Sequence, residues 1–373
     1  MRAAVLGAGI GGLAAALALE RAGWDVVVLE RTGSFVPVGS GLTIFPNGLL
    51  ALGHLGARAD VEALRGEWTT RVQAGIRSPD GRWLARWSPR MVSDAAVVER
   101  SRLHEVLLGA LRTSTVETGR EVVSAGSTVV RCADGAEVTD LDLVVAADGI
   151  NSRVRAARPG DPGVRYAGYQ AWRAVTDEPV PTEAVGEVWG HGRRFGIAPL
   201  GDGRVYWFAT ETAPREVART DEAAVVAELF GSWCDPVPRL LAATARDRVQ
   251  RLPIEALASP VRHPVDGRVV LLGDAAHAMT PDVGQGANQA LEDAAALGAL
   301  LAGAADVDTA LARWTALRVP RWVGVSRQAR VAGRTGQLSG PAATVRDALL
   351  RLLPTSVLDR QTAALHAWEV PRH

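Results

Sequence analysis

The sequence predicts an α/β fold in which a Rossmann-like parallel sheet is combined with an inserted mixed β-sheet and a helical C-terminus. Three observations predict this class. Residues 1–30 have the pattern strand, glycine-rich turn, helix and strand, which is typical of a parallel, doubly wound sheet. Residues 66–100 and 166–210 contain alternating, aromatic-rich segments broken by turns, as in antiparallel strands. Residues 310–368 are mostly helical in composition.

The βαβ unit at the N-terminus predicts a dinucleotide site. Its strand, helix and second strand are expected at residues 2–6, 13–21 and 25–29. Four glycines form the first turn: Gly7, Gly9, Gly11 and Gly12. They permit a tight turn, close approach of the backbone to a pyrophosphate and close packing of helix on strand, and the helix N-terminus attracts the phosphates. Glu30 ends the second strand, where it can accept both ribose hydroxyls, as in FAD and NAD sites alike.

Further elements are predicted from apolar periodicity and turn residues. Hairpins containing Trp68, Trp83 and Trp87 are expected around the turn at residues 78–81. A helix is expected at residues 100–111, and two strands at residues 122–130 and 137–147, around the Asp134-Gly135 turn. Several strands are expected at residues 166–210, a buried strand at residues 268–272 and a long helix at residues 285–301.

This order predicts that the second sheet is inserted between separated segments of the first. We expect a discontinuous nucleotide-binding domain at residues 1–65, 95–160 and 255–330. The inserted domain is expected at residues 66–94 and 161–254, and C-terminal helices at residues 331–373.

A second motif is Asp148-Gly149-x-x-Ser152-x-x-Arg155, which follows an apolar strand. Taken alone, it is explained equally well as a turn followed by a helix N-cap.

A third motif runs from Leu271 to Asn288. Asp274 ends a strand, where its carboxylate can accept a sugar-like hydroxyl. Pro281 follows in a loop, and Gly284 and Gly286 open a long helix whose free N–H groups can stabilise an anion or an electron-rich carbonyl. His277, within the same motif, is interpreted as a structural histidine rather than a proton carrier.

Together, the three motifs resemble those of the group A flavoprotein monooxygenases, the para-hydroxybenzoate hydroxylase superfamily. The resemblance covers nearly the whole chain and is greatest to the branch of the FAD-dependent urate hydroxylases and zeaxanthin epoxidases. It implies a GR2-type FAD-binding domain, with the inserted sheet as the substrate domain. Segment 39–47 resembles the part of the family's fold beside the isoalloxazine ring.

The resemblance implies a set of cofactor contacts in this chain. The residues concerned are Gly7, Gly9, Gly11, Gly12, Glu30, Arg31, Ser40, Gly41, Thr43, Arg100, Val123, Asp148, Arg155, Asp274, Gly284, Gly286, Ala287 and Asn288. It also implies catalytic or substrate-facing roles for Arg194, Tyr206 and Pro281.

The implied reaction is hydroxylation of an aromatic or heteroaromatic small molecule. NADH or NADPH reduces FAD, and O₂ then gives a C4a-hydroperoxide that donates oxygen to the ring. The cofactor supplies the difficult chemistry, so a catalytic triad or carboxylate pair is not required. Segment 170–173, Gln-Ala-Trp-Arg, departs from the urate enzymes, and urate itself is therefore not predicted.

Composition excludes several other classes. Lys plus Arg and Asp plus Glu both number 41, all basic residues are Arg, and no nucleic-acid or membrane partner is expected. Cys132 and Cys234 are isolated, which predicts no metal site and fits a cytoplasmic location. A monomer or homodimer is expected.

Two alternatives stay open at this level. One is a flavin-dependent epoxidase or other oxidoreductase of the same fold; a halogenase is disfavoured because Trp-x-Trp-x-Ile-Pro is absent. The other is a non-catalytic flavin-binding protein.

Overall fold

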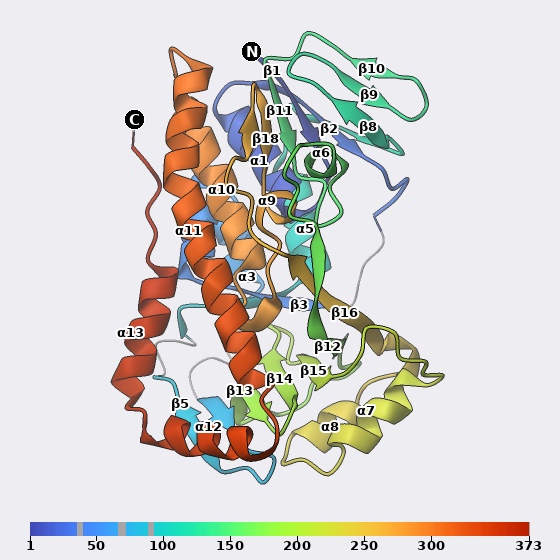
Figure 1. The fold of residues 1–373 in the computed structure, drawn as a ribbon, viewed down its shortest axis with the longest axis vertical. Helices are drawn as coiled ribbons and strands as arrows, with labels where there is room; N and C mark the ends of the chain where they lie inside the picture. Colours follow the sequence, from blue (N-terminus) through green and yellow to red (C-terminus); the bar gives the residue numbers. More distant parts are fainter. Residues whose placement is uncertain (36–39, 66–71, 89–92, 373) are drawn as a thin grey trace.

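The computed structural model describes residues 1–35, 40–65, 72–88 and 93–372 (Figure 1). Trp68, predicted in a hairpin, and Gly39 lie outside these residues. The predicted combination of a parallel sheet, a mixed sheet and a helical C-terminus is confirmed. The two sheets occupy opposite ends of the long axis, and a long C-terminal helix runs past both (Figure 1).

The first sheet has six strands in the order β17-β18-β11-β1-β2-β7 and is parallel except at its β17 edge. Its strands are β1 (Arg2–Leu6), β2 (Asp25–Glu30), β7 (Thr115–Thr118), β11 (Leu143–Ala146), β17 (Val265–Asp266) and β18 (Val269–Leu271). Strands buried on both faces need continuous apolar sequence, and β1, β11 and β18 have it. Helix α1 (Ile10–Arg21) packs on this sheet and contacts α5 (Arg100–Ala110) and α10 (Gly286–Leu301).

The second sheet has seven strands in the order β16-β12-β15-β14-β13-β4-β5. Its strands are β4 (Gln73–Arg77), β5 (Trp83–Arg86), β12 (Val164–Val175), β13 (Ala184–Trp189), β14 (Arg193–Pro199), β15 (Val205–Thr212) and β16 (Gln250–Leu257). All its pairs are antiparallel except β4 with β13. The predicted hairpin around residues 78–81 is confirmed as β4–β5.

One face of the second sheet is covered by α7 (Glu222–Phe230) and α8 (Val237–Ala242). Trp172, Phe195 and Trp207 point to that face and form a core with Phe230 and Leu240. Side chains alternate between the faces of a strand, so the residues between these aromatics point the opposite way, toward the first sheet.

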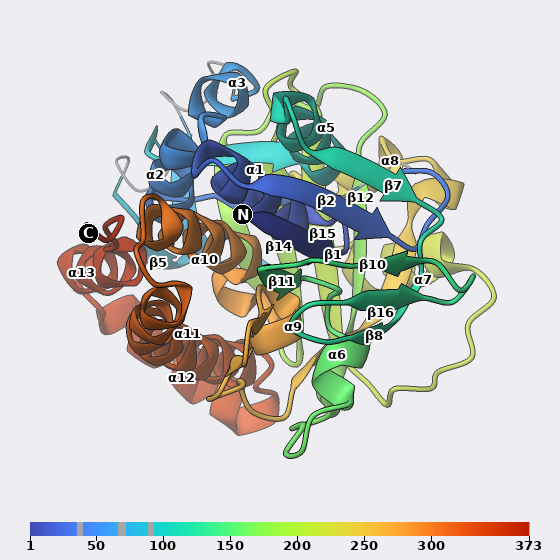
Figure 2. The same ribbon diagram turned by 90° about the horizontal axis from the view of Figure 1, so that it is seen from above.

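Smaller elements complete the chain between these strands and helices. They are β3 (Gly41–Ile44), β6 (Ala96–Glu99), α2 (Pro46–Leu55), α3 (Arg58–Ala63), α6 (Arg153–Ala156), α9 (Asp274–His277), and the 3₁₀ turns η2 (Arg246–Arg248) and η3 (Pro281–Val283). Strand β3 pairs with β6. The C-terminal helices are α11 (Val307–Gly336), α12 (Gly340–Leu352) and α13 (Thr355–His366), and α10 and α11 lie side by side along one flank (Figure 2).

Several predicted boundaries were wrong. Helix α1 begins at Ile10 rather than Leu13, because Gly11 and Gly12 already belong to its first turn. The predicted strand at 122–130 is instead a tight hairpin of β8 (Val122–Ala125) and β9 (Val130–Cys132). The predicted strand at 137–147 is also divided. Its first part, β10 (Glu137–Val138), pairs with β9, and Asp140, at a φ of 58°, turns the chain into β11 of the parallel sheet.

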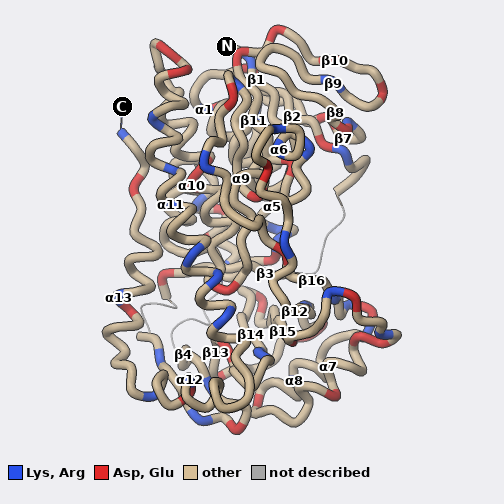
Figure 3. The backbone as a smooth tube through the Cα atoms, viewed as in Figure 1, with Lys and Arg blue, Asp and Glu red and all other residues tan. Residues whose placement is uncertain are grey.

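The predicted domain boundaries at 254/255 and 330/331 fall inside β16 and α11. Basic and acidic residues are interspersed along the described chain (Figure 3). No helix within the described ranges is long and apolar enough to cross a membrane.

Glu20 in the last turn of α1 provides a pH-dependent contribution to stability. Its carboxylate accepts hydrogen bonds from the backbone N–H groups of Arg112, Thr113 and Ser114 and from the Ser114 hydroxyl, at 2.7–3.1 Å. Burial alone would raise the pKa of Glu20, but these hydrogen bonds lower it from 4.5 to about 2. The stabilisation is therefore complete above about pH 4.5 and is lost as the pH falls toward 2.

Replacing Glu20 with glutamine is expected to lower the free energy of unfolding by about 1–2 kcal/mol at pH 7. Urea denaturation measured between pH 7 and pH 2.5 should show this difference shrinking with pH. Glu228→Gln, at an exposed position on α7, serves as the control. A difference that stays constant down to pH 2.5 would contradict the assigned role.

Candidate functional site

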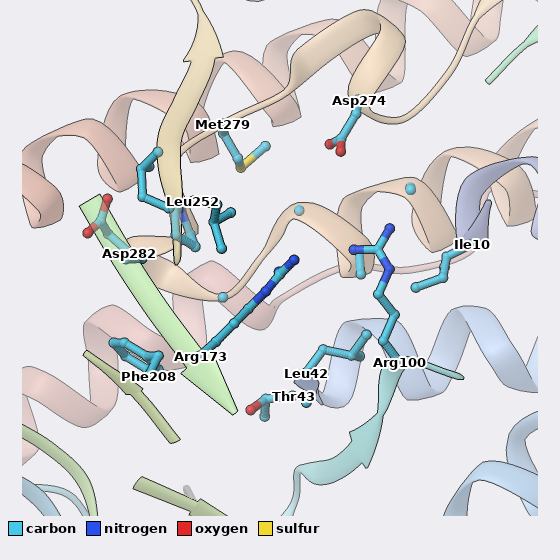
Figure 4. A pocket seen from close by; sticks show the side chains of 18 of the residues that line it. Ile10, Leu42, Thr43, Arg100, Arg173, Phe208, Leu252, Asp274, Met279 and Asp282 are labelled. Atoms are coloured by element: carbon cyan, nitrogen blue, oxygen red, sulfur yellow. The ribbon is translucent and has the colours of Figure 1, made fainter. Parts of the chain in front are cut away.

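A cavity of about 380 Å³, here the central cavity, lies between the two sheets (Figure 4). One wall is made by segments that follow the carboxyl ends of β1, β11 and β18, where ligands bind in open parallel sheets. The opposite wall is the face of the second sheet turned away from α7 and α8. Strand β3 and the start of α10 close the sides.

The glycine-rich turn is shaped by backbone contacts. Gly7 has a φ of 95°, and a Cβ added there would lie 2.6 Å from the carbonyl oxygen of Ala147. A Cβ at Gly12 would lie 1.8 Å from the carbonyl oxygen of Gly7, so only glycine lets α1 pack on β1. Around Gly9, by contrast, nothing in the part of the chain that the structure describes lies within 4 Å of the added Cβ, and Gly9 and Gly11 line the central cavity. Gly7 and Gly12 thus shape the turn, and Gly9 leaves space for a ligand.

Two predicted carboxylates lie beside this turn. Glu30 accepts hydrogen bonds from the backbone N–H groups of Ala8 at 2.7 Å and Thr32 at 2.9 Å. One oxygen of Asp148 accepts from the N–H of Arg153 at 2.9 Å, and the other, Oδ1, is buried with no partner among the described residues. Gly149, next to Asp148, also has open space around an added Cβ. A buried acceptor and open backbone are what a polar cofactor requires.

The start of α10 lines the central cavity with Gly286 and Ala287, and Pro281 and Gly284 precede them. Asn288 lies one residue deeper, is fully buried and does not line the cavity. Its side-chain amide donates to the carbonyls of Thr43 and Gly284 and accepts from the N–H of Phe45, all at 2.9–3.0 Å. Asn288 therefore joins β3 to the loop before α10, a positioning role.

Strand β3 contributes Gly41 and Thr43 to the cavity, and Ser40 just before it is buried. The carbonyl of Ser40 accepts a hydrogen bond from the N–H of Arg100 at 2.8 Å. The Arg100 side chain points into the cavity toward Asp274 and Ile10 (Figure 4).

The second sheet supplies alternate residues to the cavity. On β15 they are Tyr206, Phe208 and Thr210, on β12 Ala171 and Arg173, and on β16 Leu252 and Ile254. Burial raises the pKa of the Tyr206 phenol, opposed by the nearby charges of Arg173 and Arg100, so the phenol is neutral at physiological pH. This wall combines apolar side chains with polar ones, as is usual for sites that bind small molecules.

Arg194 on β14 lies in the cavity wall, but its guanidinium is held by protein carboxylates. It pairs with Asp282 of η3 and, at 3.4 Å, with Glu187 of β13. Tyr169 donates a further hydrogen bond to Asp282 at 2.8 Å. Although desolvation opposes its charge, Glu187 and Asp282 raise the pKa of Arg194. The ion pair fixes η3, and with it Pro281, against the sheet.

Three other predicted cofactor residues lie outside the central cavity. Arg31 is exposed. Val123 on β8 is 46% exposed and lines a separate, smaller cavity of about 190 Å³. Arg155 is buried and bound to Asp161 at 2.8 Å and to the carbonyl of Ala275, so it holds α9 in place.

A buried polar network beneath the cavity was not predicted. Arg318 of α11 binds both Glu292 and Asp293 of α10, the latter at 2.7 Å. Asn47 donates to Glu292 at 2.6 Å and to Gln285 at 2.9 Å. The available sequence signal was the pair of acids within the alanine- and leucine-rich helix, followed by arginines on the next helix.

His277 belongs to the same network, as the structural interpretation expected. Its Nε2 lies 2.6 Å from Asp293, and its ring lies against Trp322. Burial would raise the pKa of Asp293, but His277 and Arg318 hold it below its ordinary value. The network fixes the start of α10 at the cavity.

Comparison with known proteins agrees with this geometry. A family model described as an FAD binding domain matches residues 1–321. The aurachin C monooxygenase/isomerase of Stigmatella aurantiaca is 37% identical over 372 residues, covering 96% of each protein. An FAD-dependent urate hydroxylase of Klebsiella pneumoniae is 34% identical over 337 residues, covering 86% of each. The crystal structure of Klebsiella pneumoniae HpxO with FAD and uric acid matches with a TM-score of 0.88 at 29% identity, over 98% of this chain and 96% of that one.

The fold is that of a flavoprotein of the FAD-binding-domain family, and the chain belongs to that family. It is an FAD-dependent monooxygenase of the group A type, and NADH or NADPH is the cosubstrate typical of the family.

Proposed function

We propose that this enzyme hydroxylates a heteroaromatic small molecule held between FAD and the second sheet. The observation that carries the proposal is the contrast between the two walls of the central cavity. One wall has glycine backbone and a helix N-terminus, and next to its Gly149 lies Asp148, whose buried Oδ1 has no partner among the described residues. The other is made of side chains of the second sheet, with the apolar Phe208, Leu252 and Ile254 beside the polar Arg173 and Tyr206.

The residues of the first wall fit FAD. Gly9 and Gly11, at the positive end of α1, would hold the pyrophosphate, and Glu30 the adenosine ribose. Asp274 would hold the ribityl chain, and Arg100, Gly41 and Thr43 would contact the flavin side. The proposed contacts of Arg31, Val123 and Arg155 lie away from the central cavity and rest on resemblance alone.

When bound, FAD supplies the redox chemistry: it accepts a hydride from NAD(P)H and activates O₂. The chain supplies binding, orientation and exclusion of water. The N–H groups at Gly286 and Ala287 would stabilise negative charge at the cofactor, because they carry the partial positive charge of the α10 N-terminus. The apolar wall keeps water from the reacting ring.

For the substrate side, the urate hydroxylase and the uric acid bound to HpxO support a planar heteroaromatic compound. Tyr206 would offer a neutral phenol to the substrate, and Pro281 would border the ring. Arg194 would act mainly by holding η3, because its guanidinium is occupied by Asp282 and Glu187.

The wider organisation follows from this proposal. The first sheet with α1, α5 and α10 would form the FAD-binding domain, and the second sheet with α7 and α8 the substrate domain. We propose a cytoplasmic enzyme that acts as a monomer or homodimer.

The test is turnover of FAD-loaded enzyme under ¹⁸O₂ with NADH or NADPH and a panel of phenols, purines and quinolines. The expected result is substrate-stimulated NAD(P)H oxidation and a hydroxylated product carrying one ¹⁸O atom. An epoxide product would favour the epoxidase alternative. NAD(P)H oxidation without any oxygenated product would contradict the proposal.

A further inference from the structure

The central cavity contains an arginine that has no partner among the described residues. Arg173 on β12 lines the cavity, yet its guanidinium has no hydrogen-bond or ion-pair partner anywhere in the described ranges, and its Nε is buried. Arg194, on the same wall, is bound by two carboxylates. The charge of Arg194 is therefore compensated by protein carboxylates, whereas the charge of Arg173 is not compensated by any described residue.

The state of Arg173 is unusual for this protein. Arg173 is half-buried, whereas three buried arginines each place a nitrogen within 2.8 Å of a carboxylate: Arg155, Arg318 and Arg346. Removing a charged group from water costs several kcal/mol unless a partner compensates. An uncompensated guanidinium in a cavity is therefore best explained by a partner that arrives with a ligand.

The surroundings of Arg173 define that ligand. In the sheet register Arg173 lies opposite Phe208, and Ala171 and Leu252 line the adjacent row. Its side chain extends to the middle of the cavity, away from Asp282 (Figure 4). Burial, together with the charge of Arg100, lowers the pKa of Arg173, opposed by Tyr206, but a guanidinium keeps its proton in proteins. On the second-sheet wall, apolar side chains thus flank a cation that has no partner among the described residues.

The position of Arg173 favours the substrate over the cofactor as the source of the anion. The pyrophosphate of FAD is the cofactor's strongest anion, and the glycine turn at Gly9 and Gly11 lies on the opposite wall. Arg100 extends toward that wall, near Asp274 and Ile10, whereas Arg173 belongs to the substrate-facing sheet (Figure 4).

We propose that Arg173 binds an ionised oxygen of the substrate, so that the substrates are planar heteroaromatic acids carrying a carboxylate or an enolate. This inference rests on the proposed function and specifies its substrate class. The forked guanidinium can hold a carboxylate through two parallel hydrogen bonds, which fixes the in-plane orientation of the ring. Phe208, Ala171 and Leu252 contact the rest of the ring, and this combination selects which carbon faces the flavin.

The test compares charged and neutral ligands of the same shape. Three pairs are titrated into FAD-loaded enzyme without NAD(P)H, and binding is followed by the flavin absorbance. The pairs are quinoline-2-carboxylate with its carboxamide, pyridine-3-carboxylate with its carboxamide, and 2-hydroxybenzoate with 2-hydroxybenzamide. The variants are Arg173→Gln and Arg173→Lys, with Arg262→Gln, at an exposed position, as the control.

The wild type and the control are expected to bind at least one acid about tenfold more tightly than its amide. Arg173→Gln should reduce that ratio to about one, and Arg173→Lys should retain part of it, because lysine keeps the charge but lacks the fork. The affinity for FAD should change by less than about twofold in all variants.

Three results would overturn the inference. The first is an acid preference that persists in Arg173→Gln, and the second is a wild type that prefers the acid in none of the pairs. The third is loss of FAD from Arg173→Gln with the ligand ratio unchanged, which would assign Arg173 to the cofactor. Because binding is measured without turnover, the role of Arg173 in ligand binding can be judged even if the ¹⁸O₂ experiment yields no hydroxylated product.

Discussion

Replacing Arg318 with methionine is expected to lower the free energy of unfolding by about 3–5 kcal/mol. Arg318 is 1% exposed and neutralises Glu292 and Asp293, whose side chains are fully buried. Methionine fills much of the same volume but removes the positive charge that both carboxylates share, leaving Asp293 hydrogen-bonded to His277 and Glu292 paired with the half-buried Arg321. The loss comes from carboxylates deprived of compensation within the core, not from a cavity.

The measurement is guanidinium chloride denaturation with FAD at the same saturating concentration in every sample. Arg327→Met, at an exposed position on the same helix, is the matched control and should change stability by less than about 0.5 kcal/mol. If Arg318→Met and the control unfold at the same denaturant concentration, the network does not hold α10 in place.

Replacing Gly9 with valine is expected to weaken FAD binding at least about a hundredfold, or roughly 2.7 kcal/mol. Gly9 has φ −72° and ψ −179°, which valine adopts without strain, and no atom of the described residues lies within 4 Å of the added Cβ. The side chain would instead occupy space needed for close approach of the backbone to the pyrophosphate. The fold should therefore persist while cofactor affinity falls.

Gly12→Ala is the informative comparison, because its Cβ would meet the Gly7 carbonyl at 1.8 Å. That variant should lose stability as well as FAD. Circular dichroism of the apo-proteins and FAD titration by fluorescence quenching separate the two effects. A Gly9→Val protein that retains wild-type FAD affinity would show that the glycine turn is not part of the cofactor site.

The sequence was most informative where local chemistry determines the structure. The glycine spacing from Gly7 to Gly12, with Glu30 after the next strand, predicted the βαβ unit that the structure shows. The aromatic segments predicted the second sheet because strand patterning is local. The motifs Asp148-Gly149 and Gly273-Asp274, in that order along the chain, predicted that two distant segments meet at one site. Gly149 and Asp274 both line the central cavity.

What the sequence could not provide were partners distant in the chain. Arg173 and Arg194 lie on two strands of the same sheet, β12 and β14, but only the fold shows that Asp282 and Glu187 bind Arg194, whereas Arg173 has no partner among the described residues. Asn288 belonged to a cofactor motif, yet its amide binds backbone 245 residues away at Thr43. Such pairings depend on tertiary packing, which no single-sequence pattern encodes.

A crystal structure of the chain with FAD tests the assignment of the central cavity most directly. The expected density runs from a pyrophosphate at Gly9 and Gly11, past Asp274, to an isoalloxazine ring beside Gly284–Ala287 that faces Arg173 and Phe208. FAD bound outside this cavity, or an isoalloxazine ring separated from the β12–β15 wall by protein, would contradict it.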